Sequence, residues 1–262
     1  MPGLHTILVG KGRPYYVFLH GLFGRGKNWA GIARAVFDAN GDASVLFDLP
    51  NHGNSLWTTH FDYVEMADLI AAELRTKLGS APQVTLVGHS MGGKVAMLVA
   101  LRHPDVVKGL VVIDIAPAES RQIVTSIPLA SAMLNLDLNA FKHRSEASAL
   151  MSVDVPSPTL RAFLLQNLRP SPTWHWDLNL ELLATNIDQA GDWPAVEGVY
   201  PGPVLWIAGG KSQYVLPEHV PIMKQLFPAV DLVTLPEAGH WVHADDPDGV
   251  IDQLLAFREQ VG

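Results

Sequence analysis

The sequence predicts an α/β fold with a mostly parallel central sheet that helices cover on both faces. Short apolar runs alternate with helix-like periodic segments along most of the 262 residues, and such alternation is typical of parallel sheets. A chain of this length can bury one large core. The alternation breaks after Ala116 and resumes near Gly202. We therefore expect a core formed by residues 1–116 and 202–262, with an inserted helical cap at 117–201.

Each element is predicted from its own apolar pattern, with strands at short continuous runs and helices at helical spacing. The helix over 91–102 should end at Arg102-His103-Pro104, because proline cannot continue a helix. The predicted strands cover residues 4–9, 15–19, 43–47, 83–88, 109–115, 203–208 and 230–235, and the predicted core helices cover residues 27–38, 62–78, 91–102, 217–226 and 247–260. In the cap, helices are expected at 120–135, 139–151, 158–168 and 177–189, with no strand.

One pentapeptide has the spacing of a nucleophile elbow. Gly88-His89-Ser90-Met91-Gly92 follows the apolar run Val84-Thr85-Leu86-Val87 and opens a predicted helix. In such a corner the serine backbone is strained, and bulkier residues in place of the two glycines would collide with the neighbouring strand and helix. The N–H of Met91 would face a developing oxyanion. An ordinary tight turn is the alternative, but the strand before the corner and the helix after it favour Ser90 as a nucleophile.

A histidine partner is expected near the end of the chain, because the acid and then the histidine follow the serine in this arrangement. His240 lies in Ala238-Gly239-His240-Trp241, between the predicted strand 230–235 and the last helix. A loop at this place can bring the imidazole to the serine. We therefore predict His240 as the general base; a structural loop histidine is the alternative.

The acid is missing from its usual place. The loop after the strand 203–208 has Ser212 where an aspartate is commonly found, and a serine cannot carry the charge that stabilises an imidazolium. Asp114 interrupts the apolar strand 109–115 at its carboxyl end, where parallel sheets place their sites, and a carboxylate there is costly without a partner. We predict Asp114 as the acid; capping of a helix or pairing with a cation is the alternative. Weaker candidates are Glu119, Glu218 and Asp245.

A second glycine-containing loop lies near the N-terminus. The predicted strand Tyr15-Tyr16-Val17-Phe18-Leu19 runs into His20-Gly21-Leu22-Phe23-Gly24. In hydrolases with an HGxxG loop, the residue after the first glycine supplies the second oxyanion N–H, which is Leu22 here. We expect His20 to orient this loop. Phe23 is predicted to contact substrate, with a place in the core as the alternative.

Together these residues resemble the α/β-hydrolase superfamily over nearly the whole chain, and the full set of motifs is similar to that of the YbfF-type bacterial acyl esterases. The motifs are His20-Gly21-Leu22-Phe23-Gly24, Asn51-His52-Gly53-Asn54-Ser55, Gly88-His89-Ser90-Met91-Gly92-Gly93-Lys94, Val111-Val112-Ile113-Asp114-Ile115-Ala116-Pro117 and Gly239-His240-Trp241-Val242-His243. The resemblance implies a serine esterase acting on acyl esters or thioesters, with Trp241 beside the site as a substrate contact. Pro50 stands where that family has an arginine, so any role of that arginine in binding a polar acyl tail has no counterpart at this position.

Composition argues against several classes of partner. The chain has 18 Lys and Arg against 26 Asp and Glu, a formal charge of −8, and no basic cluster in the sequence. Nucleic acid and anionic membrane surfaces are therefore not expected as partners. The absence of cysteine excludes disulfides, a thiol nucleophile and thiolate metal sites. No signal-like segment and no run of about 18 apolar residues is present, so we expect a cytoplasmic protein without stable membrane insertion. No metal or other cofactor is expected, and the oligomeric state is open.

The predicted function is hydrolysis of small to medium acyl esters, or of thioesters, through an acyl-enzyme on Ser90. Alternatives on the same fold are a cofactor-free perhydrolase or haloperoxidase and a carbon–carbon bond hydrolase. A catalytically silent ligand-binding hydrolase is the alternative from another class, against which Ser90 and His240 argue. Apolar cap residues are candidates for the wall of the acyl pocket, although each is more easily explained as cap core: Met133, Leu134, Leu138, Met151, Phe163, Leu164, Trp174 and Trp176.

Overall fold

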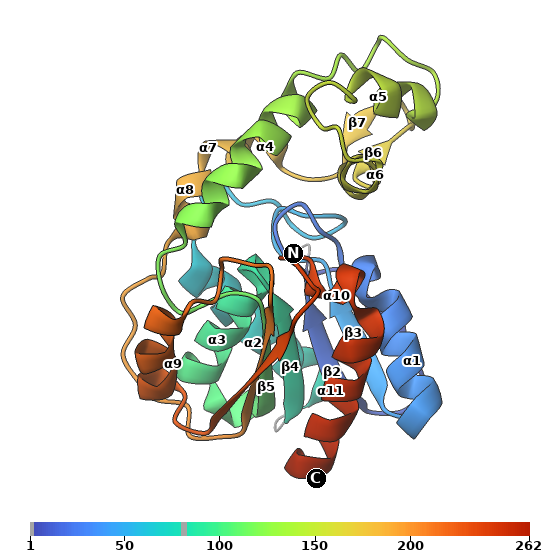
Figure 1. Ribbon diagram of the computed structural model, residues 1–262. Coiled ribbons are helices and arrows are strands. Elements are labelled where there is room, and N and C mark those ends of the chain that lie inside the picture. Colours follow the sequence, from blue (N-terminus) through green and yellow to red (C-terminus); the bar gives the residue numbers. More distant parts are fainter. Residues whose placement is uncertain (1–2, 80–82) are drawn as a thin grey trace.

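The computed structural model describes residues 3–79 and 83–262, and its centre is a seven-stranded sheet with the strand order β1-β3-β2-β4-β5-β8-β9 (Figure 1). Among the described strands of this sheet, the edge pair β1 and β3 is antiparallel and all other neighbours are parallel. The strands are β1 (Thr6–Val9), β2 (Pro14–Leu19), β3 (Ala43–Phe47), β4 (Val84–His89), β5 (Val107–Ile113), β8 (Val204–Gly209) and β9 (Val230–Leu235). The predicted mostly parallel sheet is confirmed.

Helices cover both faces of this sheet, as predicted. The covering helices are α1 (Ala30–Asn40), α2 (Tyr63–Leu78), α3 (Met91–Arg102), α9 (Val220–Leu226) and α11 (Pro247–Val261). Helices α1 and α11 share one hydrophobic cluster with strand residues such as Phe18 and Val111, while α2, α3 and α9 share the other with their neighbours Leu19 and Val112. Side chains alternate across a strand, so the central strands are buried on both faces and their sequences are almost continuously apolar.

The core differs from the predicted elements mainly in short turns. Helix α1 is preceded by a 3-10 turn, η1 (Gly26–Trp29), and α9 by another, η4 (Pro217–His219); η2 (Pro104–Val106) follows α3. The structure also has an unpredicted helix, α10 (Val242–Asp245), directly after the loop that carries His240. Elements this short show no periodicity from which a sequence could predict them.

Residues 117–201, which we call the cap, lie between β5 and β8 and extend over the core (Figure 1). The cap elements are η3 (Arg121–Ser126), α4 (Ile127–Leu134), α5 (Arg144–Leu150), α6 (Pro158–Leu165), β6 (Leu168–Arg169), β7 (His175–Trp176), α7 (Leu180–Thr185) and α8 (Ile187–Gly191). The expectation of no strand in the cap is wrong, because β6 and β7 pair as a short antiparallel ribbon. The single helix predicted over 177–189 is two helices that meet at Asn186.

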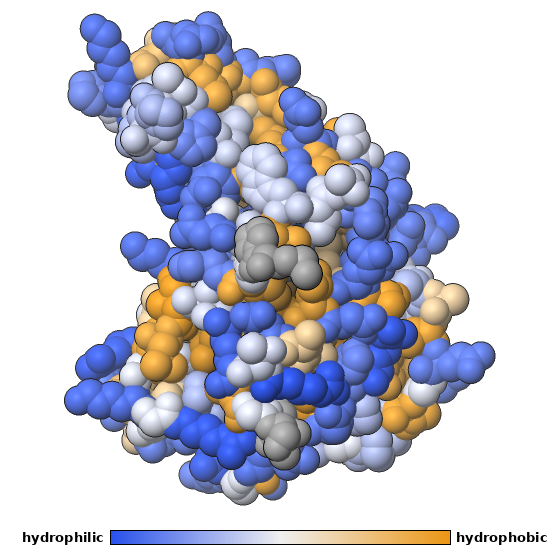
Figure 2. Space-filling view, turned by 180° about the vertical axis from the view of Figure 1, so that it is seen from behind, coloured by the Kyte–Doolittle hydropathy of each residue, from blue (hydrophilic) through white to orange (hydrophobic). Residues whose placement is uncertain are grey.

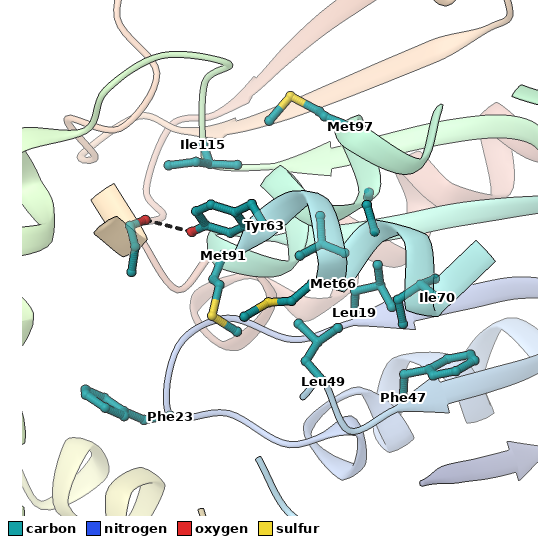
Figure 3. Packing of buried hydrophobic residues seen from close by; sticks show 14 of the residues in the cluster. Leu19, Phe23, Phe47, Leu49, Tyr63, Met66, Ile70, Met91, Met97 and Ile115 are labelled. Carbon is teal, nitrogen blue, oxygen red and sulfur yellow. Dashed lines mark hydrogen bonds between the residues drawn. The ribbon is translucent and has the colours of Figure 1, made fainter. Parts of the chain in front are cut away.

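Buried polar groups of the core hold the C-terminal end of the cap. The hydroxyl of Tyr63 donates to the carbonyl of Ala190 at 2.7 Å (Figure 3). The ammonium of Lys94, which has no exposed surface, donates to the carbonyls of Gly191 and Asp192, the latter at 2.7 Å. Burial lowers the pKa of Lys94 to about 7. Because Lys94 lies on α3, these bonds connect the helix that follows Ser90 directly to the cap.

The surface mixes hydrophilic and hydrophobic side chains, and on the face shown in Figure 2 the cap overhangs the core above a hollow. Among the described residues, no helix is long and apolar enough to cross a membrane. Within the same ranges, no group of three or more His, Asp or Glu side chains is arranged to hold a metal ion.

Candidate active site

Ser90 lies in a sharp corner between β4 and α3. Its backbone has φ 52° and ψ −121°, a conformation that residues with a Cβ rarely adopt. The flanking glycines are required by space: a Cβ on Gly88 would lie 2.3 Å from the carbonyl oxygen of Gly92, and a Cβ on Gly92 would lie 2.5 Å from that of His20. The corner therefore has the strain and the close backbone contacts of a nucleophile elbow.

Ser90, His240 and Asp114 lie in one chain of hydrogen bonds. The Oγ of Ser90 is 3.1 Å from Nε2 of His240, and Nδ1 of His240 is 2.8 Å from Oδ2 of Asp114. Asp114 follows the end of β5 and is fully buried, with a positive φ of 51°. When Nδ1–H is donated to the carboxylate, Nε2 is left to accept from the serine hydroxyl. The structure thus brings together the three residues selected from the sequence, in the geometry that a serine-histidine-aspartate triad requires.

The carboxylate of Asp114 has further partners. Ser212 donates its hydroxyl to the same oxygen, Oδ2, and the N–H of Gly209 donates to Oδ1 at 2.9 Å. A buried charge needs such compensating donors. Since β5 and β8 are parallel neighbours, their carboxyl ends bring the two loops together. Ser212, in the position where an acid is usual, supports the acid of the adjacent strand.

In the described part of the chain, the weaker candidates for the acid form no hydrogen bond or ion pair with the imidazole of His240. Asp245 accepts a hydrogen bond from the N–H of Gly239 at 2.8 Å and so fixes the loop just before His240. Glu119 lies 3.8 Å from Arg121 on the surface, and Glu218 belongs to η4. Asp114 is therefore the carboxylate that the fold presents to this histidine.

Two aromatic rings hold His240 in place. The ring of Tyr214 stacks on the imidazole, with centroids 3.7 Å apart and planes at 16°. His89 donates from Nε2 to the main-chain carbonyl of His240 at 2.8 Å. Burial, together with the nearby His243 and His240, holds the pKa of His89 well below its ordinary value. His89 is thus a neutral donor that fixes the backbone of the loop.

The HGxxG loop lies against Ser90. A Cβ on Gly21 would be 3.3 Å from Cβ of Ser90 and 2.9 Å from Nδ1 of His89. The N–H groups of Leu22 and Met91 have no hydrogen-bond partner among residues 3–79 and 83–262, as is usual for the first N–H groups of a helix such as α3. Two such free amides close to the serine can stabilise an oxyanion.

His20 makes the contacts of an orienting residue. Its Nδ1 donates to the carbonyl of Gly21 at 2.8 Å, and its Nε2 accepts from the N–H of Leu49 at 2.9 Å. Both ring nitrogens are therefore used within the loop region. Burial lowers the pKa of His20, which agrees with a neutral ring that donates once and accepts once.

The backbone of Phe23 is clamped from both sides. This residue has a positive φ of 61°. Its N–H donates to Nε2 of His52 at 3.2 Å, and its carbonyl accepts from Nδ2 of Asn167 at 2.8 Å. Burial, with His20 nearby, lowers the pKa of His52 to about 3, so the ring is neutral and can accept. Because Asn167 belongs to the cap, a cap residue helps to fix the peptide groups that follow Leu22.

A narrow pocket of about 40 Å³ lies over Ser90. Its walls on the core side include Leu22, Phe23 and Trp241, and its cap residues are Ile123, Ser126, Leu129 and Phe163. Of the cap residues expected in the wall, Phe163 alone lines this pocket in the described part of the chain. The other seven lie elsewhere: Met133, Met151 and Leu164 are buried in the hydrophobic core, Leu134 is exposed, and Leu138, Trp174 and Trp176 are partly buried against that core. Apolar character alone does not show whether a cap side chain faces the pocket.

Several residues of this site escape prediction from the sequence. Tyr214, His52 and Asn167 act through contacts across separate loops, and no local spacing indicates those contacts. His243 lines the pocket, and its Nδ1 has no partner among the described residues. His52 and His243 lie within motifs quoted from the sequence, but those motifs do not indicate which contacts the two rings make.

The comparisons with known proteins agree with this geometry. The family model described as the alpha/beta hydrolase fold matches residues 17–247. The chain belongs to the α/β-hydrolase family. This α/β-hydrolase is 39% identical to the mouse protein named sn-1-specific diacylglycerol lipase ABHD11, over 98% of the chain and 85% of the mouse protein.

Two further relatives of this α/β-hydrolase bear on the predicted family. Esterase YbfF of Escherichia coli is 29% identical over 92% of the chain and 91% of that protein. The solved structure of a marine microorganism esterase has a TM-score of 0.91 and 32% identity, covering 98% of the chain and all of the neighbour. The predicted superfamily, its fold and the class of ester hydrolase are confirmed.

Proposed function

We propose that this α/β-hydrolase is a serine esterase that cleaves small to medium acyl esters through an acyl-enzyme on Ser90, with His240 as base and Asp114 as orienting acid. The unbroken hydrogen-bond chain through these three residues, beneath a narrow pocket, carries the proposal. The mouse relative is named for diacylglycerol, so the proposed substrates include acyl esters of glycerol.

The first half of the reaction forms the acyl-enzyme. Nε2 of His240 takes the proton of the Ser90 hydroxyl while Oγ attacks the ester carbonyl carbon. The N–H groups of Leu22 and Met91 hold the negative charge that develops on the carbonyl oxygen; one such donor typically contributes about 3 kcal/mol. The imidazolium, stabilised by Asp114, then gives its proton to the departing alcohol as the carbon–oxygen bond breaks.

The second half releases the acid. Water takes the place of the alcohol, gives a proton to His240 and attacks the acyl carbon. The second tetrahedral intermediate uses the same amides, and its collapse breaks the bond to Oγ of Ser90, which regains the proton from His240. No cofactor enters this sequence.

In this proposal the cap, residues 117–201, roofs the acyl pocket. Phe163 contacts Trp241 edge to face, with centroids 6.5 Å apart, so that a cap ring meets a ring of the core beside the pocket. Such closure excludes water from the acyl group. With a volume of about 40 Å³, the pocket favours short acyl chains.

The test is a series of p-nitrophenyl esters from acetate to palmitate, measured on the wild type and on Ser90→Ala. We expect a burst of nitrophenol and highest kcat/KM for short chains in the wild type, with no hydrolysis and no labelling by a fluorophosphonate in the variant. Labelling of Ser90→Ala would remove Ser90 from its role. The perhydrolase, carbon–carbon hydrolase and silent-binding alternatives have no specific contact in their favour.

A further inference from the structure

A second cleft lies between the core and the cap, next to the pocket over Ser90. Its volume is about 600 Å³, far larger than that of the pocket. Four basic side chains line it: Arg25 and Lys27 from the core, and Arg144 and Arg169 from the cap. No local run of sequence predicts this group, because the fold collects it from segments more than a hundred residues apart. Figure 2 shows the cap overhanging the core with a hollow beneath it.

The cleft and the pocket share a wall. Asn28 lines both, and its Nδ2 donates to Oε1 of Gln166, a cap residue of the cleft, at 2.8 Å. The pocket and the cleft are therefore adjacent, with this pair of amides between them. The small pocket suits the acyl group, and the cleft has room for the rest of the molecule.

Two of the four basic side chains are already matched by carboxylates. Oδ2 of Asp177 lies 3.0 Å from Nη1 of Arg25 and 3.2 Å from Nε of Arg169. Asp48 is 3.9 Å from Nη2 of Arg25 and 2.9 Å from Nδ1 of His5. Arg25 is itself buried, with 7% of its surface exposed. The charges of Arg25 and Arg169 are thus balanced by those of Asp177 and Asp48, as a buried charge requires.

Lys27 and Arg144 remain unmatched. Neither has an acidic partner in the described ranges; the Nη2 of Arg144 donates to the carbonyl of Leu168 at 2.7 Å. They line the cleft from opposite sides, Lys27 on η1 and Arg144 at the start of α5. The chain has a net charge of −8, so two cations without an acidic partner at one cleft make this part of an acidic protein locally positive. A phosphate monoester, with about 1.5 to 2 negative charges at neutral pH, matches them in charge.

We propose that this cleft binds a phosphate group on the substrate, at the end remote from the ester that Ser90 cleaves. The inference rests on the proposed esterase function and names its substrate class. The guanidinium of Arg144 can present two N–H groups to one phosphate, and Lys27 adds a mobile point charge from the facing wall. Substrate esters with a phosphate then bind in one orientation, with the acyl group at the pocket.

The experiment compares 1-butyrylglycerol 3-phosphate with neutral 1-butyrylglycerol, following release of butyrate. In the wild type at low ionic strength we expect kcat/KM to be at least about tenfold higher for the phosphate ester, since charge-assisted hydrogen bonds are the strong ones. The higher kcat/KM of the phosphate ester should come from a lower KM, and the ratio between the two esters should become smaller in about 0.5 M salt. A third substrate, the carboxylate ester 4-(butanoyloxy)butanoate, distinguishes the anion: a preference for it equal to that for the phosphate ester would overturn the assignment to phosphate.

The variants are Lys27→Gln, Arg144→Gln and the double variant, with Lys224→Gln and Arg34→Gln as controls that remove exposed cations elsewhere. Lys27 and Arg144 are exposed, but Arg144→Gln also removes the hydrogen bond to the carbonyl of Leu168, so the melting temperature of each variant is measured beside its activity. We expect the ratio of kcat/KM for the phosphate ester to that for the neutral ester to fall severalfold in each single variant and to approach one in the double variant. The kcat/KM of the neutral ester should not change in these variants, and the control variants should keep the wild-type ratio. A wild-type ratio near one, or an unchanged ratio in the double variant, would refute the phosphate site. Failure to hydrolyse the neutral ester would instead refute the esterase proposal.

Discussion

Replacing Asp114 by Asn should cost far more activity than replacing Ser212 by Ala, although both side chains contact each other. Asp114 accepts from Ser212 and His240 on Oδ2 and from Gly209 on Oδ1. An asparagine would have to turn its NH₂ toward one of these sides. If it faced His240, the imidazole would adopt the wrong tautomer and could not take a proton from Ser90; if it faced Gly209, two donors would meet in a buried place.

The magnitudes follow from these contacts. The comparable aspartate-to-asparagine change in a serine protease triad lowers kcat by about 10⁴ through the tautomer, and we expect a loss of that order here. Ser212→Ala removes one of three donors to a carboxylate. A hydrogen bond to a charged group contributes about 1.5–3 kcal/mol, which sets an upper limit of roughly ten- to a hundredfold.

The assay is kcat/KM for p-nitrophenyl butyrate on both single variants and on the double variant, with Ser152→Ala as the control. Ser152 donates its hydroxyl only to the carbonyl of Ala149 in the cap and should behave as wild type. The double variant should be no slower than Asp114→Asn, because the contribution of Ser212 depends on the carboxylate. Equal and small losses in the two single variants, or losses that multiply in the double variant, would refute this account of the acid.

Three other perturbations test the surroundings of the site. Asn167→Ala should lower kcat by roughly five- to tenfold at nearly unchanged KM, because loss of its hydrogen bond to Phe23 is worth about 1 kcal/mol. Asn139→Ala, on the cap surface, is the control. Equal kcat values for the two variants would show that the hydrogen bond from Asn167 to Phe23 does not matter for the reaction. Gly92→Ala should lower the melting temperature, with an overpacking cost of about 3 kcal/mol, since its Cβ would lie 2.5 Å from backbone oxygens; Gly31→Ala, with nothing within 4 Å, should not destabilise. Burial lowers the pKa of His52 to about 3, so between pH 6 and pH 5 this ring takes up a proton in the unfolded chain and stays neutral in the folded protein. The free energy of unfolding should therefore fall by about 1 kcal/mol for this ring from pH 6 to pH 5. Urea unfolding of the wild type and of His52→Gln at both pH values separates this ring from His20 and His89, whose pKa values burial also lowers. An equal fall in the two proteins would contradict a neutral buried His52.

Local spacing was sufficient to predict the strands and most of the helices, because each depends on a repeat in its own segment. It failed for the ribbon formed by β6 and β7 and for α10, which are too short to have a period. It also failed for the wall of the pocket. Leu129 and Met133 are both apolar members of α4, yet Leu129 lines the pocket while Met133 is fully buried in the hydrophobic core.

The sequence by itself determined the motifs around Ser90, His240 and Asp114, because a corner between two glycines and a carboxylate in an apolar strand are local facts. The tertiary structure alone decided how these parts act on one another. The parallel pairing of β5 with β8 brings Ser212 to Asp114, and the return of the cap over the core brings Asn167 to Phe23. It also gathers Lys27 and Arg144 at one cleft. Such contacts join residues that are distant in the chain, and they depend on where whole elements pack, which no short stretch of sequence specifies.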